Sequence, residues 1–174
     1  MVKLNTSNPD KLREYRKLGL EDLKVSTIDL EEPDADPYTV IRYKATQAGP
    51  DVLVEDTSLD VEGADIGINI KWLLASLDEL TGRKATFRVL IGVLQEGKIK
   101  IYQGEVSGKL VECDNPSGFG FDPYFLPDGA TQTLSESKPK KYNARALAVQ
   151  NVKKDRPHKV ADPIHEWGGP FQKD

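Results

Sequence analysis

Near its start the chain reads VKLNTSNPDK, from Val2 to Lys11, and this stretch carries the order of elements on which the fold depends. Val2–Leu4 predicts a short opening strand. Asn8 followed by Pro9 is a polar N-cap with proline at the first helical position, so a helix is expected to begin here. The order strand, polar turn, helix is the repeating unit of proteins that combine helices with a parallel sheet.

The same alternation continues beyond this stretch. A second strand is expected at 24–30, and further strands at 52–54, 87–94, 99–101 and 105–112, with Glu96-Gly97 as a hairpin turn. Further helices are expected to begin at Asp36-Pro37, to span 70–77 and to span 144–151. We therefore predict a mixed α/β protein in which strand–helix alternation is combined with a hairpin sheet.

Composition narrows the class of protein. The chain has 174 residues, of which 38% are hydrophobic and 30% charged, a balance typical of one globular domain. No apolar run is long enough for a membrane span, and one cysteine, Cys113, excludes an internal disulfide and a thiolate zinc cluster. The net charge of −4 argues against nucleic acid as a partner. We expect a cytoplasmic protein with a core at 2–152 and a loosely packed tail at 154–174.

The turn from Thr6 to Lys11 is a candidate anion site. The start of a helix presents free backbone N–H groups and a positive dipole end, and Thr6, Ser7 and Asn8 add polar side chains. Lys11 adds a positive charge one turn later. Taken alone, the same residues also fit an ordinary capped helix with a solvated lysine.

Acidic residues follow two of the expected strands. Glu55 and Asp56 come directly after Val52–Val54, and Glu31, Glu32, Asp34 and Asp36 follow 24–30. Ligands of open α/β sheets gather outside the carboxyl ends of strands, and Mg²⁺ prefers carboxylate oxygens. The alternatives are a turn residue with a helix cap for the pair, and a solvated loop for the cluster.

A glycine-rich segment, SGFGFDP at 117–123, could approach a flat ligand closely. Phe121 offers a stacking face and Asp122 could accept hydrogen bonds from ring N–H groups. By itself the segment is equally a glycine-rich turn with two core phenylalanines.

The joint occurrence of these segments, in this order, resembles the inosine triphosphate pyrophosphatase family. The resemblance runs from Val2 to about Val152 and rests on TSNPDK, VLVEDTSL, IKW, GFGFDPYF with the following PDG and QT, and a final RAL. It implies an elongated mixed sheet with two α/β lobes flanking a central nucleotide-binding cleft, and a homodimer. The implied reaction is hydrolysis of non-standard purine nucleoside triphosphates to the monophosphate and pyrophosphate, by magnesium-assisted attack of water on the α-phosphorus.

The resemblance also implies roles for individual residues. Glu32 and Asp56 would hold Mg²⁺, and Asp56, with Glu55, would orient or deprotonate water. Lys11 and Lys44 would neutralise phosphate charge. The remaining implied substrate contacts are Thr6, Ser7, Asn8, Thr57, Lys71, Phe119, Gly120, Phe121, Asp122, Lys141 and Arg145.

The chain departs from the family pattern in three places. The family's Pro-Gly pair after Leu59 is missing, and nothing in the segment after Lys154 is familiar. The family's Ser-His-Arg near the end is also altered, since Asn143-Ala144 precede Arg145 and no histidine is available. Because that histidine and arginine contact the base, we expect altered base specificity, with a pyrimidine or other modified nucleotide, or nucleotide binding without turnover, as alternatives.

Overall fold

A computed structural model describes residues 2–67, 77–113, 122–137 and 139–172. The chain runs through the following elements: β1 (Lys3–Asn5), α1 (Pro9–Lys17), β2 (Lys24–Ser26), α2 (Pro37–Ala48), β3 (Val52–Val61), β4 (Ala64–Gly67), α4 (Leu77–Leu80), β5 (Lys84–Gln95), β6 (Lys98–Leu110), η1 (Asp122–Tyr124), β7 (Phe125–Pro127), η2 (Lys140–Tyr142), α5 (Ala144–Lys153) and β8 (Lys159–Ala161).

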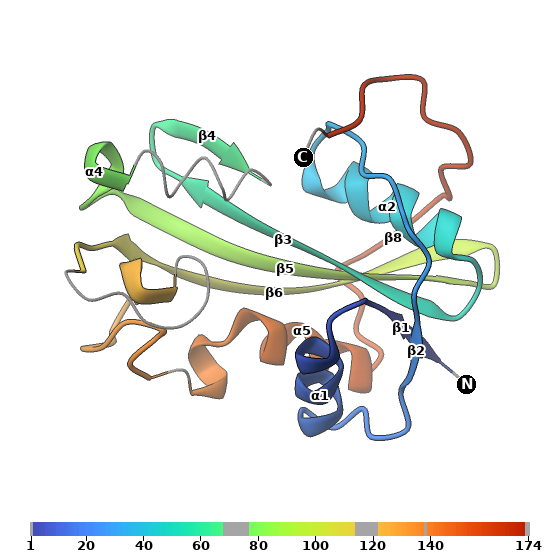
Figure 1. Cartoon of the computed structure of the whole chain (residues 1–174), viewed down its shortest axis with the longest axis horizontal. Coiled ribbons are helices and arrows are strands. Elements are labelled where there is room, and N and C mark those ends of the chain that lie inside the picture. Colours follow the sequence, from blue (N-terminus) through green and yellow to red (C-terminus); the bar gives the residue numbers. More distant parts are fainter. Residues whose placement is uncertain (1, 68–76, 114–121, 138, 173–174) are drawn as a thin grey trace. The chain divides into compact units, whose positions relative to one another are not determined.

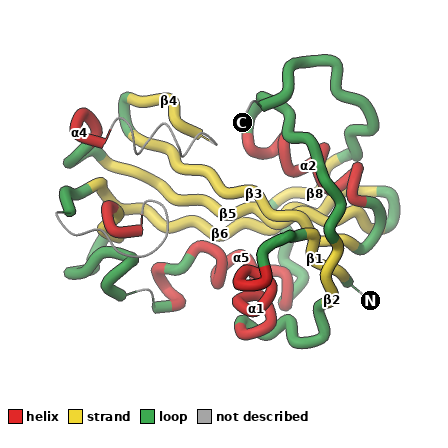
Figure 2. The backbone as a smooth tube through the Cα atoms, viewed as in Figure 1, coloured by secondary structure: helices red, strands yellow, loops and turns green. Residues whose placement is uncertain are grey.

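The strands form one mixed sheet of eight strands in the order β2-β1-β3-β5-β6-β7, with β4 paired to β3 and β8 paired to β6. β1 is parallel to both β2 and β3, whereas β7 and β8 run antiparallel to β6. Figure 1 and Figure 2 show the long strands β3, β5 and β6 beside one another, with the helices outside the sheet. The predicted mixed α/β fold is confirmed.

The chain divides into two compact units. The first contains Met1–Asp56, Leu90–Gln103 and Ala148–Asp174, and the second contains Thr57–Val89 and Gly104–Leu147. The predicted central cleft and the single domain therefore stay predictions, and each unit is described by itself below. Among the described residues, no helix has the length and apolarity that a membrane crossing needs.

The core of the first unit fixes α2 on one face of β3. A buried cluster joins side chains of α2 to those of three strands: Ile41, Ala45, Ala48, Val52, Val54, Leu90, Ile99 and Ile101. Gly92 permits the close approach, because a Cβ there would lie 2.8 Å from Cγ1 of Ile41. Each buried isoleucine contributes about 1.5–3 kcal/mol, so the position of α2 against β3 is strongly set.

Several local predictions hold and two need correction. Glu96 and Gly97 form the predicted hairpin turn, with φ of 54° and 75°, and α1, α2 and α5 begin close to the expected residues. The strand expected at 24–30 ends at Ser26, and β3 continues through Glu55 and Asp56 to Val61, with β5 as its neighbour in the sheet and β4 paired at Leu59 and Val61. Most of the helix expected at 70–77 lies outside the described residues.

In the expected loosely packed tail, no residue of 156–172 is buried, but the backbone of this segment is hydrogen-bonded to distant parts of the chain. β8 pairs with β6 in the register Ile99↔Ala161 to Ile101↔Lys159. The N–H of His158 donates to the carbonyl of Ile101 at 2.7 Å. Proline, glycine and charge in this segment indicate only the absence of regular structure, and its backbone groups instead bond to distant parts of the chain.

Candidate active site

The turn between β1 and α1 is held by its own polar side chains. Asn8 is the N-cap of α1, and its Oδ1 accepts hydrogen bonds from the N–H groups of Asp10, at 2.9 Å, and Lys11, at 3.4 Å. The N–H of Asn8 donates to Oγ1 of Thr6 at 3.1 Å. The side-chain oxygen of Asn8 is thus engaged in capping the helix. The exposed Ser7 and the half-buried Thr6 lie at the positive end of the helix dipole.

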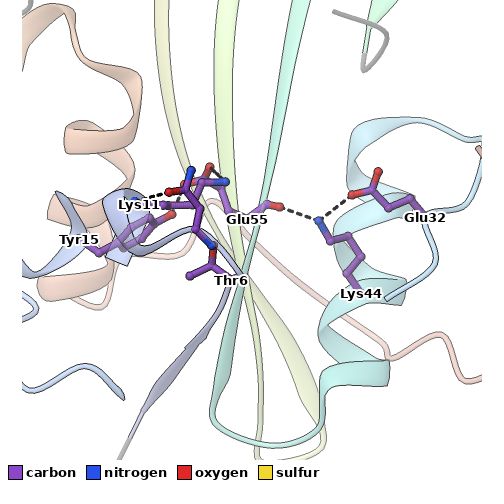
Figure 3. Close-up of polar contacts among 7 residues, drawn as sticks. Thr6, Lys11, Tyr15, Glu32, Lys44 and Glu55 are labelled. Carbon is purple, nitrogen blue, oxygen red and sulfur yellow. Dashed lines mark hydrogen bonds and ion pairs between the residues drawn. The ribbon is translucent and has the colours of Figure 1, made fainter. Parts of the chain in front are cut away.

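Glu55 is a buried carboxylate that faces α1. Its side chain is 4% exposed, and Oε1 lies 3.3 Å from Nζ of Lys11. The hydroxyl of Tyr15, itself fully buried, donates to Oε2 of Glu55. Figure 3 shows both partners on the same side of Glu55, so this carboxylate is neutralised and fixed by α1.

Lys44 of α2 lies on the other side of Glu55 and connects two acidic segments (Figure 3). Its Nζ donates to the backbone carbonyl of Glu55 at 2.7 Å and to Oε1 of Glu32 at 2.9 Å. The Lys44 side chain is 12% exposed, against 38% for Glu32. Lys44 therefore connects the partly exposed carboxylate of Glu32 to the backbone of β3.

Asp56 is, with Ser58, one of two buried side chains in the described part of the chain that have a polar atom without a hydrogen-bond partner. It is 7% exposed, and its Oδ2 is buried without a hydrogen-bond partner. Burial raises the pKa of Asp56 to about 7; the charge of Lys44 opposes this rise, and the nearby carboxylates of Glu32 and Glu55 add to it. Such a carboxyl is typical of functional sites, because an unpaired buried charge costs folding free energy.

The strand geometry separates the two adjacent acids. Side chains alternate between the faces of a strand, so Asp56 shares a face with Val54, which packs against α2. Glu55 faces Lys11 and Tyr15 of α1 instead. The prediction that the pair follows the end of a strand is wrong, because both residues lie inside β3; the strand that ends here is its parallel neighbour β1.

A cavity of about 400 Å³ opens at this end of β1. Residues of the β1–α1 turn, of 27–32, of α2 and of β3 line it: Asn5, Thr6, Ser7, Thr27, Ile28, Asp29, Leu30, Glu32, Lys44, Val54 and Glu55. The structure thus brings the predicted residues Thr6, Ser7, Glu32, Lys44 and Glu55 to one cavity, whereas Asn8, Lys11 and Asp56 are not among its lining residues. Its size suits a small ligand, and because three carboxylates line it beside Lys44, an anionic ligand would need a cation as well.

The acidic cluster has a second, structural role. Asp36 caps α2, and its carboxylate accepts from the N–H of Thr39 at 3.0 Å and from the Thr39 hydroxyl at 2.6 Å. Partial burial alone would raise the pKa of Asp36, but the hydrogen bonds from Thr39 hold it below the usual value. The sequence prediction of a cap at Asp36-Pro37 is confirmed, and only Glu32 of the cluster lines the cavity.

Sequence reasoning did not assign a role to Tyr15. The one available signal was its place one turn after Lys11 on the same helix, which puts both side chains on one face. An aromatic residue at that spacing is usual in a core, so its hydroxyl could be assigned only once Glu55 was seen opposite it.

The remaining predicted substrate contacts belong to the second unit or are not described. Lys71, Phe119, Gly120 and Phe121 lie outside the described residues. Asp122 begins η1, and Thr57 is half-buried in β3. The last two predicted substrate contacts, Lys141 and Arg145, belong to the second unit.

Lys141 and its neighbours form a small polar pocket of the second unit. Nζ of Lys141 lies 4.9 Å from the ring centroid of Tyr142, and both residues line a pocket of about 220 Å³. Oδ1 of Asn143 accepts from the N–H of Ala146 at 3.1 Å and caps α5, which carries the half-buried Arg145. Asn143 thus serves as a helix cap.

Comparison with known proteins places this geometry in a family. The sequence model of the Ham1 family matches residues 2–155. A dITP/XTP pyrophosphatase of Pyrobaculum aerophilum is 32% identical over 87% of this chain and 93% of its own, and an inosine triphosphate pyrophosphatase of Fusarium vanettenii is 31% identical over 84% and 92%.

A solved structure agrees at the level of the fold. The nucleoside-triphosphatase / dITP/XTP pyrophosphatase of Mycobacterium abscessus superposes with a TM-score of 0.58, at 19% identity, over 88% of this chain and 96% of that one. The family match spans every strand and helix from β1 to α5, including the residues around Glu55 and Asp56. This chain therefore belongs to the Ham1 family.

Proposed function

We propose that this protein is a nucleoside triphosphate pyrophosphatase that hydrolyses non-standard purine nucleotides, such as the inosine and xanthosine triphosphates, to the monophosphate and pyrophosphate. The observation that carries the proposal is the buried carboxyl of Asp56, which has an unpaired oxygen and a pKa near 7 and is surrounded by Lys44, Glu32, Glu55 and Lys11. The family relatives named for this activity support it.

The cavity residues supply positioning and charge neutralisation, which are the main requirements of phosphoryl transfer. The start of α1 offers its dipole and the hydroxyls of Thr6 and Ser7 to phosphate oxygens. Lys11 and Lys44 compensate phosphate charge. Because Lys11 also pairs with Glu55, and Lys44 with Glu32, both ammonium groups are held near the cavity before a ligand arrives.

Asp56 is the general base of the proposed reaction. Burial raises the pKa of this carboxyl in the metal-free protein, which favours its holding a proton taken from water. It would take a proton from the attacking water while the water oxygen bonds to the α-phosphorus. The bond from that phosphorus to the bridging oxygen then breaks and pyrophosphate leaves.

Glu32 and Asp56 fit a divalent cation, and we assign them to Mg²⁺. The test of this fit is Oδ2 of Asp56, a buried oxygen that a hard cation could satisfy. No cluster of three or more His, Cys, Asp or Glu side chains forms a complete metal site in the part of the chain described, so phosphate and water oxygens would complete the coordination. When bound, the ion would supply charge neutralisation at the phosphates.

The base site belongs to the proposal as well. Asn143 caps α5, and Ala144 stands where the resemblance implies the histidine that contacts the base. We therefore propose altered base specificity, read by Arg145, Lys141 and Asp122, with Phe121 stacked on the base. We also place the enzyme in the cytoplasm as a homodimer, and light scattering of the purified protein tests the dimer.

The first experiment measures pyrophosphate release from ITP, XTP, dITP, GTP, ATP and pyrimidine triphosphates, with and without Mg²⁺. Asp56→Asn is the inactive variant, and Asp60→Asn, a half-exposed acid on the same strand, is the matched control. We expect Mg²⁺-dependent release that only Asp56→Asn abolishes. Equal release by wild type and Asp56→Asn, or none from any triphosphate, contradicts the proposal. An unchanged inosine and xanthosine preference contradicts the altered base site alone.

A further inference from the structure

Residues 163–172, here called the strap, lie along the loop that carries Glu32. The N–H of Gln172 donates to the carbonyl of Glu32 at 2.8 Å, and the N–H of Asp34 donates to the carbonyl of Pro170 at 2.9 Å. Pro33 and Phe171 form an antiparallel bridge between these two bonds. Two segments more than 130 positions apart thus pair like short strands at the cavity that Glu32 lines.

Side chains strengthen this pairing. Nε2 of Gln172 donates to the carbonyl of Pro33 at 3.1 Å. The ring of Phe171 packs edge-on against Tyr43 of α2, with centroids 5.9 Å apart. Nε1 of Trp167 donates to the carbonyl of Pro170 at 2.8 Å and stabilises the bend of the strap itself.

The strap is anchored independently on α2. The N–H of Ile164 donates to Oγ1 of Thr46 at 3.0 Å, and Nε2 of Gln47 donates to the carbonyl of His165 at 3.1 Å. Figure 1 shows the segment leaving β8 and returning to the start of α2. The strap therefore spans from the helix that carries Lys44 to the loop that carries Glu32.

The loop needs such a tether because of its charge. Glu31, Glu32, Asp34 and Asp36 lie within six positions and repel one another, and Lys44 neutralises only Glu32. Glu32 is also 38% exposed, so its ion pair with Lys44 alone contributes little rigidity. Backbone bonds from the strap restrict the loop without adding charge.

We propose that the strap is a positioning element for the cation site, in which Gln172 and Phe171 hold Glu32 in place beside Lys44. The strap lies beyond residues 2–155, which the family model matches, so it is a feature of this chain rather than of the family pattern. The inference rests on the proposed function, because it takes Glu32 as a cation ligand. Gln172 and Phe171 are positioning residues that need not touch the substrate.

The test compares wild type with a chain ending at Glu166, with Gln172→Ala, and with Asp162→Asn as control. Asp162 lies in the same part of the chain but pairs with the exposed Lys98. Hydrogen–deuterium exchange of the peptide that contains 31–36 reports the tether directly, and Mn²⁺ binding without nucleotide reports the site. Activity is measured against Mg²⁺ concentration.

In the shortened chain we expect faster exchange at 31–36. We also expect a rise of about tenfold in the Mn²⁺ and Mg²⁺ concentrations for half-saturation, the usual effect of losing a group that supports a metal ligand. The rate at saturating Mg²⁺ should be retained. Gln172→Ala should shift both readouts in the same direction by less, and Asp162→Asn should match wild type.

Unchanged exchange or unchanged half-saturation in the shortened chain overturns the proposal, as does an equal effect of Asp162→Asn. If the shortened chain does not fold, Gln172→Ala decides by the same two readouts. Failure of the proposed function is a separate result, because it would remove pyrophosphate release from wild type while exchange and Mn²⁺ binding still report on the strap.

Discussion

Replacing Asp56 by asparagine should stabilise the metal-free protein increasingly as the pH rises. In the folded chain, burial raises the pKa of Asp56 from 3.8 to about 7. The charge of Lys44 lowers this pKa, but by less than burial raises it. Between these two values the folded state holds a proton that the unfolded state has released. The free energy of unfolding of the wild type therefore falls as pH rises through this window. Asparagine keeps the shape but cannot ionise.

The size of the effect follows from the pKa. The window between the two pKa values ends near pH 7, so a change from pH 5 to pH 8 covers about two pH units of it. Each unit changes the free energy of unfolding by about 1.36 kcal/mol, which gives about 3 kcal/mol in all. For a chain of 174 residues this shifts Tm by roughly 6–12 °C. The gain of Asp56→Asn over wild type should grow by that amount between pH 5 and pH 8.

Thermal unfolding in EDTA, at steps from pH 5 to pH 8, measures the gain. Asp60→Asn on the same strand is the control, because its side chain is 54% exposed rather than buried. Parallel curves for wild type and Asp56→Asn would refute the reasoning. Adding Mg²⁺ at pH 8 should stabilise wild type more than Asp56→Asn, since only the former offers the cation its carboxylate.

Three further substitutions test other parts of the structure. Tyr15→Phe removes the hydroxyl donor of the buried Glu55 and should lower the free energy of unfolding by about 1–3 kcal/mol in urea titration. Gly108→Ala should destabilise by about 1–3 kcal/mol or more, because its Cβ would lie 2.3 Å from the Leu126 carbonyl oxygen; equal stability would contradict this. Asn143→Ala should cost about 1 kcal/mol through loss of the α5 cap, and Asn143→Ser should restore most of it.

The parts of the fold that local chemistry decides could be predicted from the sequence. Asn8-Pro9 and Asp36-Pro37 each specify a cap and a first turn within four residues, and both helices begin where expected. Glu96-Gly97 specifies a two-residue turn in the same way. In each case the partners lie close in sequence, so residue type alone carries the signal.

The orientation of Glu55 and Asp56 depends on strand pairing with segments that are distant in the sequence. Treating Val52–Val54 as a whole strand placed Glu55 and Asp56 after it, where both could point to one cleft. The ten-residue β3 places them on opposite faces instead. β3 extends beyond the acidic pair beside its partners β5 and β4, and a short apolar run gives no sign of either partner.

The strap was the least predictable feature. Its contacts with Glu32 and Asp34 use backbone N–H and carbonyl groups, which every residue has, so composition cannot reveal them. Proline and glycine correctly indicated the lack of helix or strand periodicity at 163–172. They did not indicate disorder, because backbone groups outside regular elements can still be satisfied by a distant segment.

Asp56 and Asp60, two of the three acids of β3, show how the site differs from the rest of the sheet. Asp60 pairs with Arg88, which also binds Glu105, and the three side chains satisfy one another at the surface. Asp56 is buried with an unpaired oxygen and a raised pKa. The carboxyl of Asp56 lowers the free energy of unfolding of the metal-free protein at neutral pH, and asparagine or an apolar residue would not. Selection for stability alone would therefore disfavour aspartate at this position. This cost in stability is therefore an argument that Asp56 binds a ligand or takes part in a reaction.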